Sequence, residues 1–167
     1  MTSKVYSRFE IAVTQLEAAI GLYIANRDKF SVITLAGAAN TIFCGLLAKS
    51  GKETFTDSLL KEHSEKSDGQ LNADEFGSSI NNLLGINHLK HLDPDQPDSF
   101  EIEPNESALA TLLMALTNYL SIPEHDQKLF HIFKIWAQDN LDKTKYNIYL
   151  DPNWIRTEPN SNNAKKE

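Results

Sequence analysis

The chain has 167 residues, of which 41% are hydrophobic, and this is enough for one domain with a hydrophobic core. Its formal net charge of −7 disfavours broad binding to nucleic acids, because an acidic surface repels a phosphate backbone. The N-terminus lacks the apolar stretch of a secretory signal, and the single cysteine, Cys44, cannot form an intrachain disulfide, so we expect a cytoplasmic protein.

The first expected helix runs from about Ser3 to Ala25. Its apolar residues are three or four positions apart, which places them on one side of a helix. The break at residues 26–28 is short, so the second helix should fold back antiparallel to the first. Asp28 is the expected N-cap of that second helix, because its carboxylate can accept hydrogen bonds from the free amides of the first turn. The apolar residues of the first helix are Val5, Phe9, Val13, Leu16, Ile20 and Tyr23.

The second helix is the most informative segment, because no charged residue occurs from Phe30 to Ala48 although 23% of the chain is charged. Apolar residues recur there at helical spacing around a run of small residues, Ala36–Ala39. Small residues let two helices approach closely, and Gly51 is the expected C-terminal stop. We interpret the segment as the central helix of an all-α bundle, covered by neighbours on most of its sides.

A membrane span is the rival interpretation of this segment, because about 18 or more uncharged apolar residues are the usual threshold. Against a span, Asn40 lies mid-segment and is costly in lipid unless it is paired. The flanks also lack a Trp/Tyr belt on both sides, and the mean hydropathy of the chain is −0.39. We therefore expect no membrane contact.

Two shorter helices should follow. The third, more polar helix is expected from about Phe55 to Lys66, and the fourth from Ala73 through Leu84 with Asn72 as its N-cap. Two prolines in the segment Asp93–Asp98 interrupt the helical pattern, because proline has no amide donor and clashes with the preceding turn. That segment is expected to be a loop.

The fifth helix is expected just after Asn105, with a leucine-rich buried face. The sixth is expected to begin at Ser121, because Ser121 and Glu124 have the spacing of a capping box. The expected buried residues are Leu109, Leu112, Leu113, Leu116 and Leu120 in the fifth helix, and Leu129, Phe130, Phe133, Trp136 and Ala137 in the sixth.

The C-terminal pattern is different. Residues 146–150 alternate between apolar and other side chains, which suits an extended segment laid over the bundle, and residues 157–167 are rich in Asn, Lys and Glu, which predicts disorder. The chain as a whole is predicted to be all-α, with a single domain over residues 1–156. The expected architecture is an antiparallel bundle of five or six helices around a central, buried second helix.

Known catalytic and metal-binding motifs are not recognised. The segment Ser64–Glu75 imitates a calcium loop, but Lys66 stands at its third position, where an ammonium group repels the ion. The HExxH, GxSxG, P-loop and GxGxxG patterns are absent, and the five histidines are scattered. We therefore expect no catalytic residue, no metal and no cofactor.

A cluster of polar side chains just before the proline-containing loop is the one candidate ligand-binding site. It could bind a phosphate or a base, or its members could cap helix carbonyls and pair with Asp93 or Asp95. We predict the second role, with His91 closing the end of the fourth helix, because the prolines beyond it leave carbonyls without intrahelical donors. The cluster consists of Asn82, Asn87, His88, Lys90 and His91.

A family resemblance bears on function. The run Ser31-x-x-Thr34-Leu-Ala-Gly-Ala-Ala39, followed by Asn87-His-Leu-Lys-His91 and Asp93-Pro-Asp95, resembles a group of bacterial helical proteins that we associate with the HEPN superfamily. The resemblance implies a helical bundle that often dimerises. It also implies, for many members, a metal-independent ribonuclease in which an arginine precedes a catalytic histidine by a few residues.

This chain departs from that pattern, because its only arginines are Arg8, Arg27 and Arg156. Without a guanidinium group near the histidines, the phosphate charge lacks its bidentate partner. We therefore favour a non-catalytic helical bundle that acts through self-association or protein partners. The alternative is a divergent HEPN-type ribonuclease or a small nucleotide-binding protein that uses Asn87, Lys90 and His91.

Two kinds of partner are expected. A homodimer is expected because the sixth helix and the tail contain more aromatic surface than a small bundle covers. A basic protein partner is the second candidate, because residues 91–127 contain no Lys or Arg but many Asp and Glu residues; a solubilising acidic loop explains the same stretch. The aromatic residues are Phe130, Phe133, Trp136, Tyr146, Tyr149 and Trp154.

Overall fold

The computed structural model describes residues 3–66, 72–91 and 97–146, and within these ranges it has six α-helices and no strand. The predicted all-α fold is thus confirmed. Contacts divide the chain into two compact units, Met1–Phe133 and Lys134–Glu167, and the boundary between them falls inside the last helix. The helices are α1 (Arg8–Ile24), α2 (Lys29–Lys49), α3 (Phe55–Lys66), α4 (Ala73–Leu83), α5 (Pro104–Leu120) and α6 (Gln127–Asn140).

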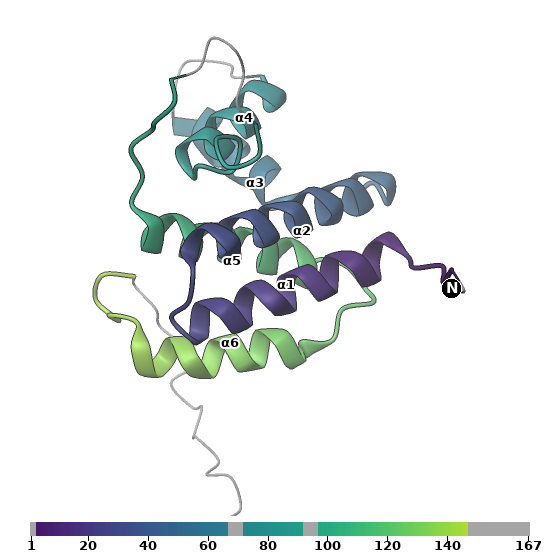
Figure 1. Ribbon diagram of the computed structural model, residues 1–167. Coiled ribbons are helices and arrows are strands. Elements are labelled where there is room, and N and C mark those ends of the chain that lie inside the picture. The colour runs from purple at the N-terminus through teal and green to yellow at the C-terminus, as the bar shows by residue number, and fades with distance from the viewer. Residues whose placement is uncertain (1–2, 67–71, 92–96, 147–167) are drawn as a thin grey trace, which may run out of the picture. The chain divides into compact units, whose positions relative to one another are not determined.

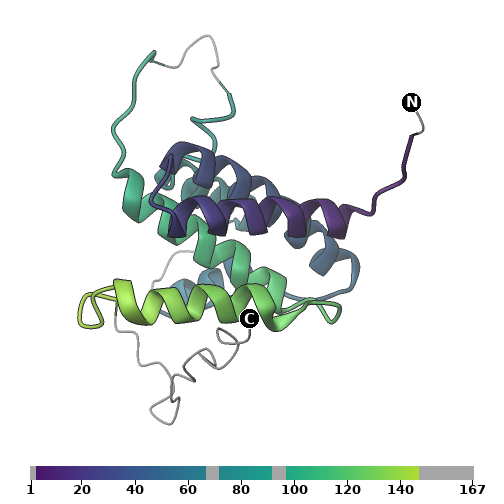
Figure 2. The ribbon, with the colours of Figure 1, turned by 60° about the horizontal axis from the view of Figure 1, so that its bottom comes forward.

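Helix α2 is the centre of the first unit. It packs mainly against α1 and α5, which also touch each other, while α3 packs against α4 and to a smaller extent against α5. Figures 1 and 2 show α1 and α2 side by side, joined by a short turn that reverses the chain. The expected antiparallel pair and the central position of the second helix are therefore confirmed.

An aromatic cluster joins the three central helices. The ring of Phe43 on α2 lies 5.6 Å from the ring of Tyr119 on α5 and 6.3 Å from that of Phe9 on α1. Phe9 also stacks on Tyr119 at 6.1 Å. Offset and tilted ring pairs at these separations stabilise a core beyond the area that they bury.

Helix α1 begins later than the sequence predicted. Ser7 is its N-cap and forms a complete capping box with Glu10, so the expected start at Ser3 is wrong. The reciprocal pair satisfies two free donors and fixes the helix start locally. Val5 therefore lies before the helix and is 95% exposed, instead of joining the buried stripe.

Three helices end in the same way. At Asn26, Gly51 and Gly85 the backbone has a positive φ of 51°, 67° and 75°. In each case the amide of this residue and the next donate to carbonyls of the last helical turn, with N–O distances of 2.8–3.1 Å. This is the Schellman arrangement, which favours glycine or asparagine because neither resists a left-handed backbone strongly. The predicted stop at Gly51 is confirmed.

Helix α2 is covered on most of its sides, but one strip of it faces outwards. The side that contacts α1 and α5 is fully buried, as at Val32, Ala36 and Phe43, but the opposite side is open. The expectation that neighbours cover most of its sides is therefore confirmed, and one strip of the helix is left open. We define the open face of α2 as its exposed and half-buried residues Thr34, Ala38, Thr41, Gly45 and Ala48.

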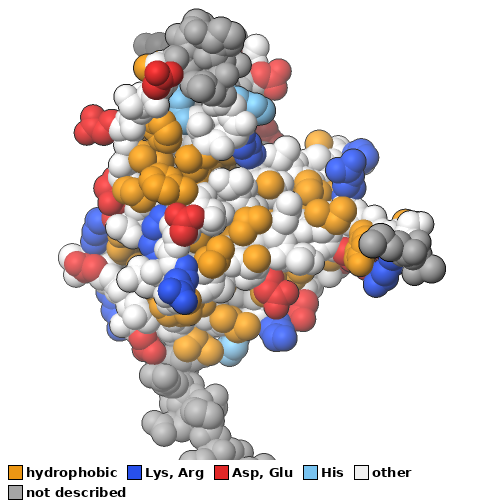
Figure 3. Space-filling view, viewed as in Figure 1, with side chains coloured by type: hydrophobic (Ala, Val, Ile, Leu, Met, Phe, Trp, Pro, Cys, Tyr) orange, Lys and Arg blue, Asp and Glu red, His pale blue; other side chains and the backbone are white. Residues whose placement is uncertain are grey.

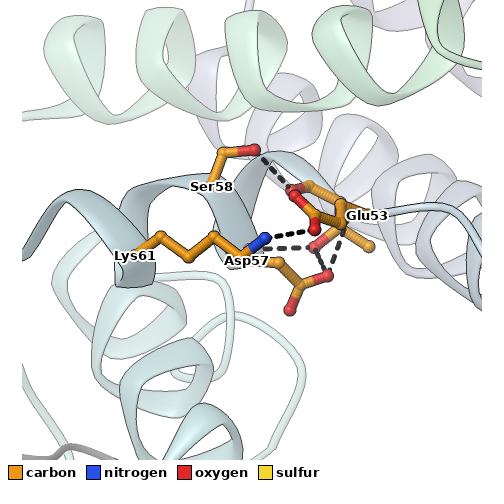
Figure 4. A network of polar contacts seen from close by, with 5 residues as sticks. Glu53, Asp57, Ser58 and Lys61 are labelled. Carbon is orange, nitrogen blue, oxygen red and sulfur yellow. Dashed lines mark hydrogen bonds and ion pairs between the residues drawn. The ribbon is translucent and has the colours of Figure 1, made fainter. Parts of the chain in front are cut away.

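Helix α3 has the predicted bounds and a polar start (Figure 4). The amide and hydroxyl of Thr54 both donate to the Asp57 carboxylate at 2.8 Å, and the Asp57 amide donates back to the Thr54 hydroxyl at 3.1 Å. Lys61, in the second turn of the helix, forms an ion pair with Glu53, which precedes the helix. Both side chains of that pair are exposed, so it adds little to stability.

Helix α4 begins as predicted, because the Asn72 side chain accepts a hydrogen bond from the Asp74 amide at 2.9 Å. The helix contains no buried residue. Its contact with α3 includes a stack between Phe76 and His63, with ring centroids 5.9 Å apart.

Two predictions for the last helices are wrong. Leu113 is 43% exposed and not buried. Ser121 is the C-cap of α5 and not the start of α6. Helix α6 begins at Gln127. The Asp126 carboxylate, just before it, accepts a hydrogen bond from the Lys128 amide. The expected extended segment after Tyr146 and the expected disordered tail lie outside the described residues.

Candidate functional site

The predicted ligand cluster lies mostly in a turn segment, residues 84–91, that follows α4. Gly85 ends the helix, since its own amide and that of Ile86 donate to the carbonyls of Asn82 and Asn81 at 3.0 and 2.8 Å. The carbonyls are thus satisfied by backbone donors inside the Schellman turn. The prediction that His91 closes this helix is wrong, because the helix ends at Leu83.

The turn segment is anchored on α2. Ile86 is only 2% exposed, and its side chain lies against Gly37, where an added Cβ would come within 2.9 Å of the Ile86 Cγ2 atom. The small-residue run of α2 therefore does allow a close approach, as expected. What approaches is a turn side chain, and not a second helix.

Three cluster residues take part in holding the segment. The Asn87 side-chain amide donates to the Asn82 side-chain oxygen at 2.7 Å, which joins the turn to the last turn of α4. The ring of His88 stacks on Phe100 with centroids 4.7 Å apart and ring planes inclined by 20°. These contacts engage the Asn87 side-chain amide and one face of the His88 ring.

Asn82, Lys90 and His91 are exposed, while Asn87 and His88 are half-buried. Protein atoms around the Lys90 amine partly remove it from water, which lowers its pKa from the ordinary value. The predicted partners Asp93 and Asp95 lie outside the described residues. A single ammonium group and one exposed imidazole bind phosphate weakly, because the bidentate geometry of a guanidinium is missing.

Metal and thiol chemistry receive no support from the described part of the chain. No group of three or more His, Cys, Asp or Glu side chains stands close enough there to hold a metal ion. Burial raises the pKa of the Cys44 thiol to about 11. The thiol is therefore protonated at neutral pH, and a protonated thiol is a poor nucleophile.

A buried polar network that the sequence did not predict lies between α2, α3 and α5. Asn118 is fully buried; its amide donates to the Asn40 side-chain oxygen at 2.7 Å, and its own oxygen accepts from the Phe55 amide at 2.8 Å. The sequence did contain one signal for the burial of Asn118. Asn118 follows Thr111 by seven residues, so both lie on the same face of α5, and Thr111 is also buried. This network holds helices together, and we assign it no ligand.

By length and composition alone, α2 could cross a membrane, but the core helix of a soluble protein passes the same test. Less than half of its most apolar window, 44%, is buried inside the structure. Figure 3 shows the surface over the middle of α2 in white and orange, with blue side chains towards its C-terminal end. The open face of α2 is thus an uncharged helix surface that the described part of the chain leaves uncovered.

Comparison with known proteins gives no functional assignment: no family model, curated protein or solved structure matches the chain.

Proposed function

We propose that this protein is a non-catalytic helical bundle that acts through self-association, and that it forms a homodimer through the open face of α2. The observation that carries the proposal is the absence of charge on this face. A helix side that faces water normally carries charged and polar residues. Here the segment Phe30–Ala48 has no charged residue, although Thr41, Gly45 and Ala48 are exposed.

The spacing of the open face supports a helix–helix contact. Its residues follow one another at intervals of four, three, four and three positions, from Thr34 to Ala48. This is the repeat of a seam along which two helices pack. Small side chains at such a seam let the helix axes come close. Leu35 and Ile42 are half-buried and border the face, so a second copy would cover apolar surface as well.

Gly45 also supports the contact. A glycine inside a helix costs about 1 kcal/mol relative to alanine. No atom lies within 4 Å of the position that its Cβ would take, so packing within one chain does not require a glycine there. A second α2 helix that packs closely against Gly45 would explain why this position has no side chain.

Insertion of α2 into a membrane is the competing explanation, and the other side of the helix argues against it. That side forms the core with α1 and α5, and Asn40 is paired with Asn118. Asp28 caps the first turn of the helix through two backbone amides. Insertion would expose this core and this charge to lipid, which is costly.

The resemblance to HEPN-type bundles, which often dimerise, also favours self-association. The aromatic surface of α6, in contrast, is smaller than the sequence indicated. Phe133 is buried and Phe130, Trp136 and Tyr146 are half-buried, while Tyr149 and Trp154 lie outside the described residues. We therefore place the dimer contact on α2 in preference to α6.

The proposal is tested by the substitution Thr41→Lys, which puts a charge in the middle of the open face. Thr117→Lys on α5 is the matched control, because both threonines are exposed and both hydroxyls donate to the carbonyl four residues earlier, at 3.0 and 2.8 Å. We expect sedimentation velocity at high micromolar concentration to show a dimer for the wild type and for Thr117→Lys. Thr41→Lys should be a monomer with an unchanged helical circular dichroism spectrum.

Three results would contradict the proposal. The first is a wild-type monomer at the highest concentration. The second is flotation of the wild type with phospholipid vesicles that the Thr41→Lys variant no longer shows. The third is cleavage of RNA by the wild type that is lost in Lys90→Ala or His91→Ala, which would favour the divergent ribonuclease.

A further inference from the structure

A groove lies between the end of α4 and the start of α5. Its volume is about 550 Å³, and its walls include the apolar side chains of Leu83, Ile102 and Ala110 together with Glu101, Glu103 and Glu106. From its shape and charge we infer that this groove binds a basic, amphipathic helical segment of a partner protein.

The apolar part of the groove is unusually open. Leu83 is 80% exposed, so its side chain gains almost nothing from folding of the chain itself. Ile102 lines the same groove and packs close to Gly85, where an added Cβ would come within 2.5 Å of the Ile102 Cδ1 atom. An exposed leucine and an isoleucine in one groove offer apolar surface that a partner side chain can cover.

All charged residues that line the groove are negative. Three of its lining residues are glutamates and none is Lys or Arg, and residues 91–127 contain no Lys or Arg. The Glu103 carboxylate is partly engaged, because it caps α5 by accepting from the Glu106 amide at 2.8 Å. Glu101 is exposed at the rim. Figure 3 shows orange side chains flanked by red ones over the chain that leads into α5.

The apolar and the acidic side chains of the groove together indicate which class of partner it binds. A phosphate backbone or an anionic membrane surface would be repelled by the glutamates. A helix with leucines on one face and lysines or arginines beside them satisfies both parts of the groove, in the mode by which amphipathic helices bind apolar grooves. The groove does not include the open face of α2, so the inference is independent of the homodimer.

The test uses a fluorescein-labelled peptide of about 18 residues, five helical turns, made only of leucine and lysine with the leucines on one face. Fluorescence anisotropy at about 0.15 M salt measures its binding to the full chain. Leu83→Ser and Glu101→Lys should each weaken binding about tenfold, through lost apolar contact and charge repulsion. The matched controls are Leu113→Ser on α5 and Glu17→Lys on α1, both exposed and outside the groove, and they should change binding less than about twofold.

The outcomes separate this inference from the proposed dimer. Thr41→Lys should bind the peptide as tightly as the wild type, whether or not the wild type is a dimer. Equal binding of a scrambled peptide of the same composition would overturn the inference, since it would show attraction by charge alone. Dissociation of a wild-type dimer by Leu83→Ser would also overturn it, because a second copy would then occupy the groove.

Discussion

At the scale of single residues, Asn118 contributes most clearly to this fold. It has no access to water, and its side chain joins α5 to Asn40 of α2 and to the first amide of α3. The Asn118 amide also lies 3.4 Å from the Cys44 sulfur. A buried polar group is tolerated only when it is hydrogen-bonded, so each member of this network depends on the others.

Replacing Asn118 by alanine should therefore destabilise the protein strongly. The change leaves the Asn40 oxygen and the Phe55 amide without their partner in the core, and we expect a loss of about 2–4 kcal/mol in the free energy of unfolding. Urea denaturation followed by circular dichroism measures this loss.

Asn140→Ala is the control for Asn118→Ala. The Asn140 amide also donates a hydrogen bond, to the Trp136 carbonyl at 2.8 Å, but Asn140 is exposed. Its loss should cost no more than about 0.5 kcal/mol. Equal losses of unfolding free energy in the two variants would show that the buried network contributes no more to stability than one exposed hydrogen bond.

At the scale of the elements, the ends of the helices decide how the chain turns. The amides that follow α1, α2 and α4 donate to the last carbonyls through a residue with positive φ. At Gly85 this conformation coincides with close packing against Ile102. The turn segment can reach Gly37 of α2 only because the chain reverses at Gly85.

Gly85→Ala should accordingly destabilise the protein by about 1–3 kcal/mol, because an L-residue at positive φ is strained and its Cβ would overlap Ile102. Gly21→Ala is the matched control, since Gly21 lies inside α1 with nothing within 4 Å of an added Cβ. That control should raise stability by up to about 1 kcal/mol. A stabilising effect of both substitutions in thermal denaturation would refute the assigned role of Gly85.

At the scale of the whole molecule, the proposed homodimer would couple stability to protein concentration. A second copy that binds only the folded chain stabilises it by mass action. We expect the wild-type melting temperature to rise as the protein concentration rises from low to high micromolar. The melting temperature of Thr41→Lys should stay constant over the same range, and a parallel rise in both would place the contact elsewhere.

The candidate site was predictable in part. The sequence identified Asn82, Asn87, His88, Lys90 and His91 as a group, and predicted that they cap helix carbonyls or pair with Asp93 or Asp95. The contacts found are different ones, a hydrogen bond between Asn87 and Asn82 and a stack of His88 on Phe100. The specific role given to His91 was wrong, because the prolines beyond it suggested a later helix end. A glycine followed by an apolar residue, Gly85-Ile86, was the local signal for the earlier end.

The sequence by itself determined what depends on neighbouring residues. Asp28 and Asn72 cap their helices as predicted, α3 has the predicted bounds, and the all-α class follows from helical periodicity. These features need only side chains and amides within one turn, so they can be read from a short window.

Only the tertiary structure decided which surfaces are covered. Leu113 and the open face of α2 fit a buried pattern but face outwards, while Asn118 fits an exposed pattern but lies in the core. Burial depends on segments that are far apart in the chain, such as Asn40 and Asn118, and periodicity does not contain that information. The physical reason is that a helix forms from local contacts, whereas the side that it buries is set by the helices that pack against it.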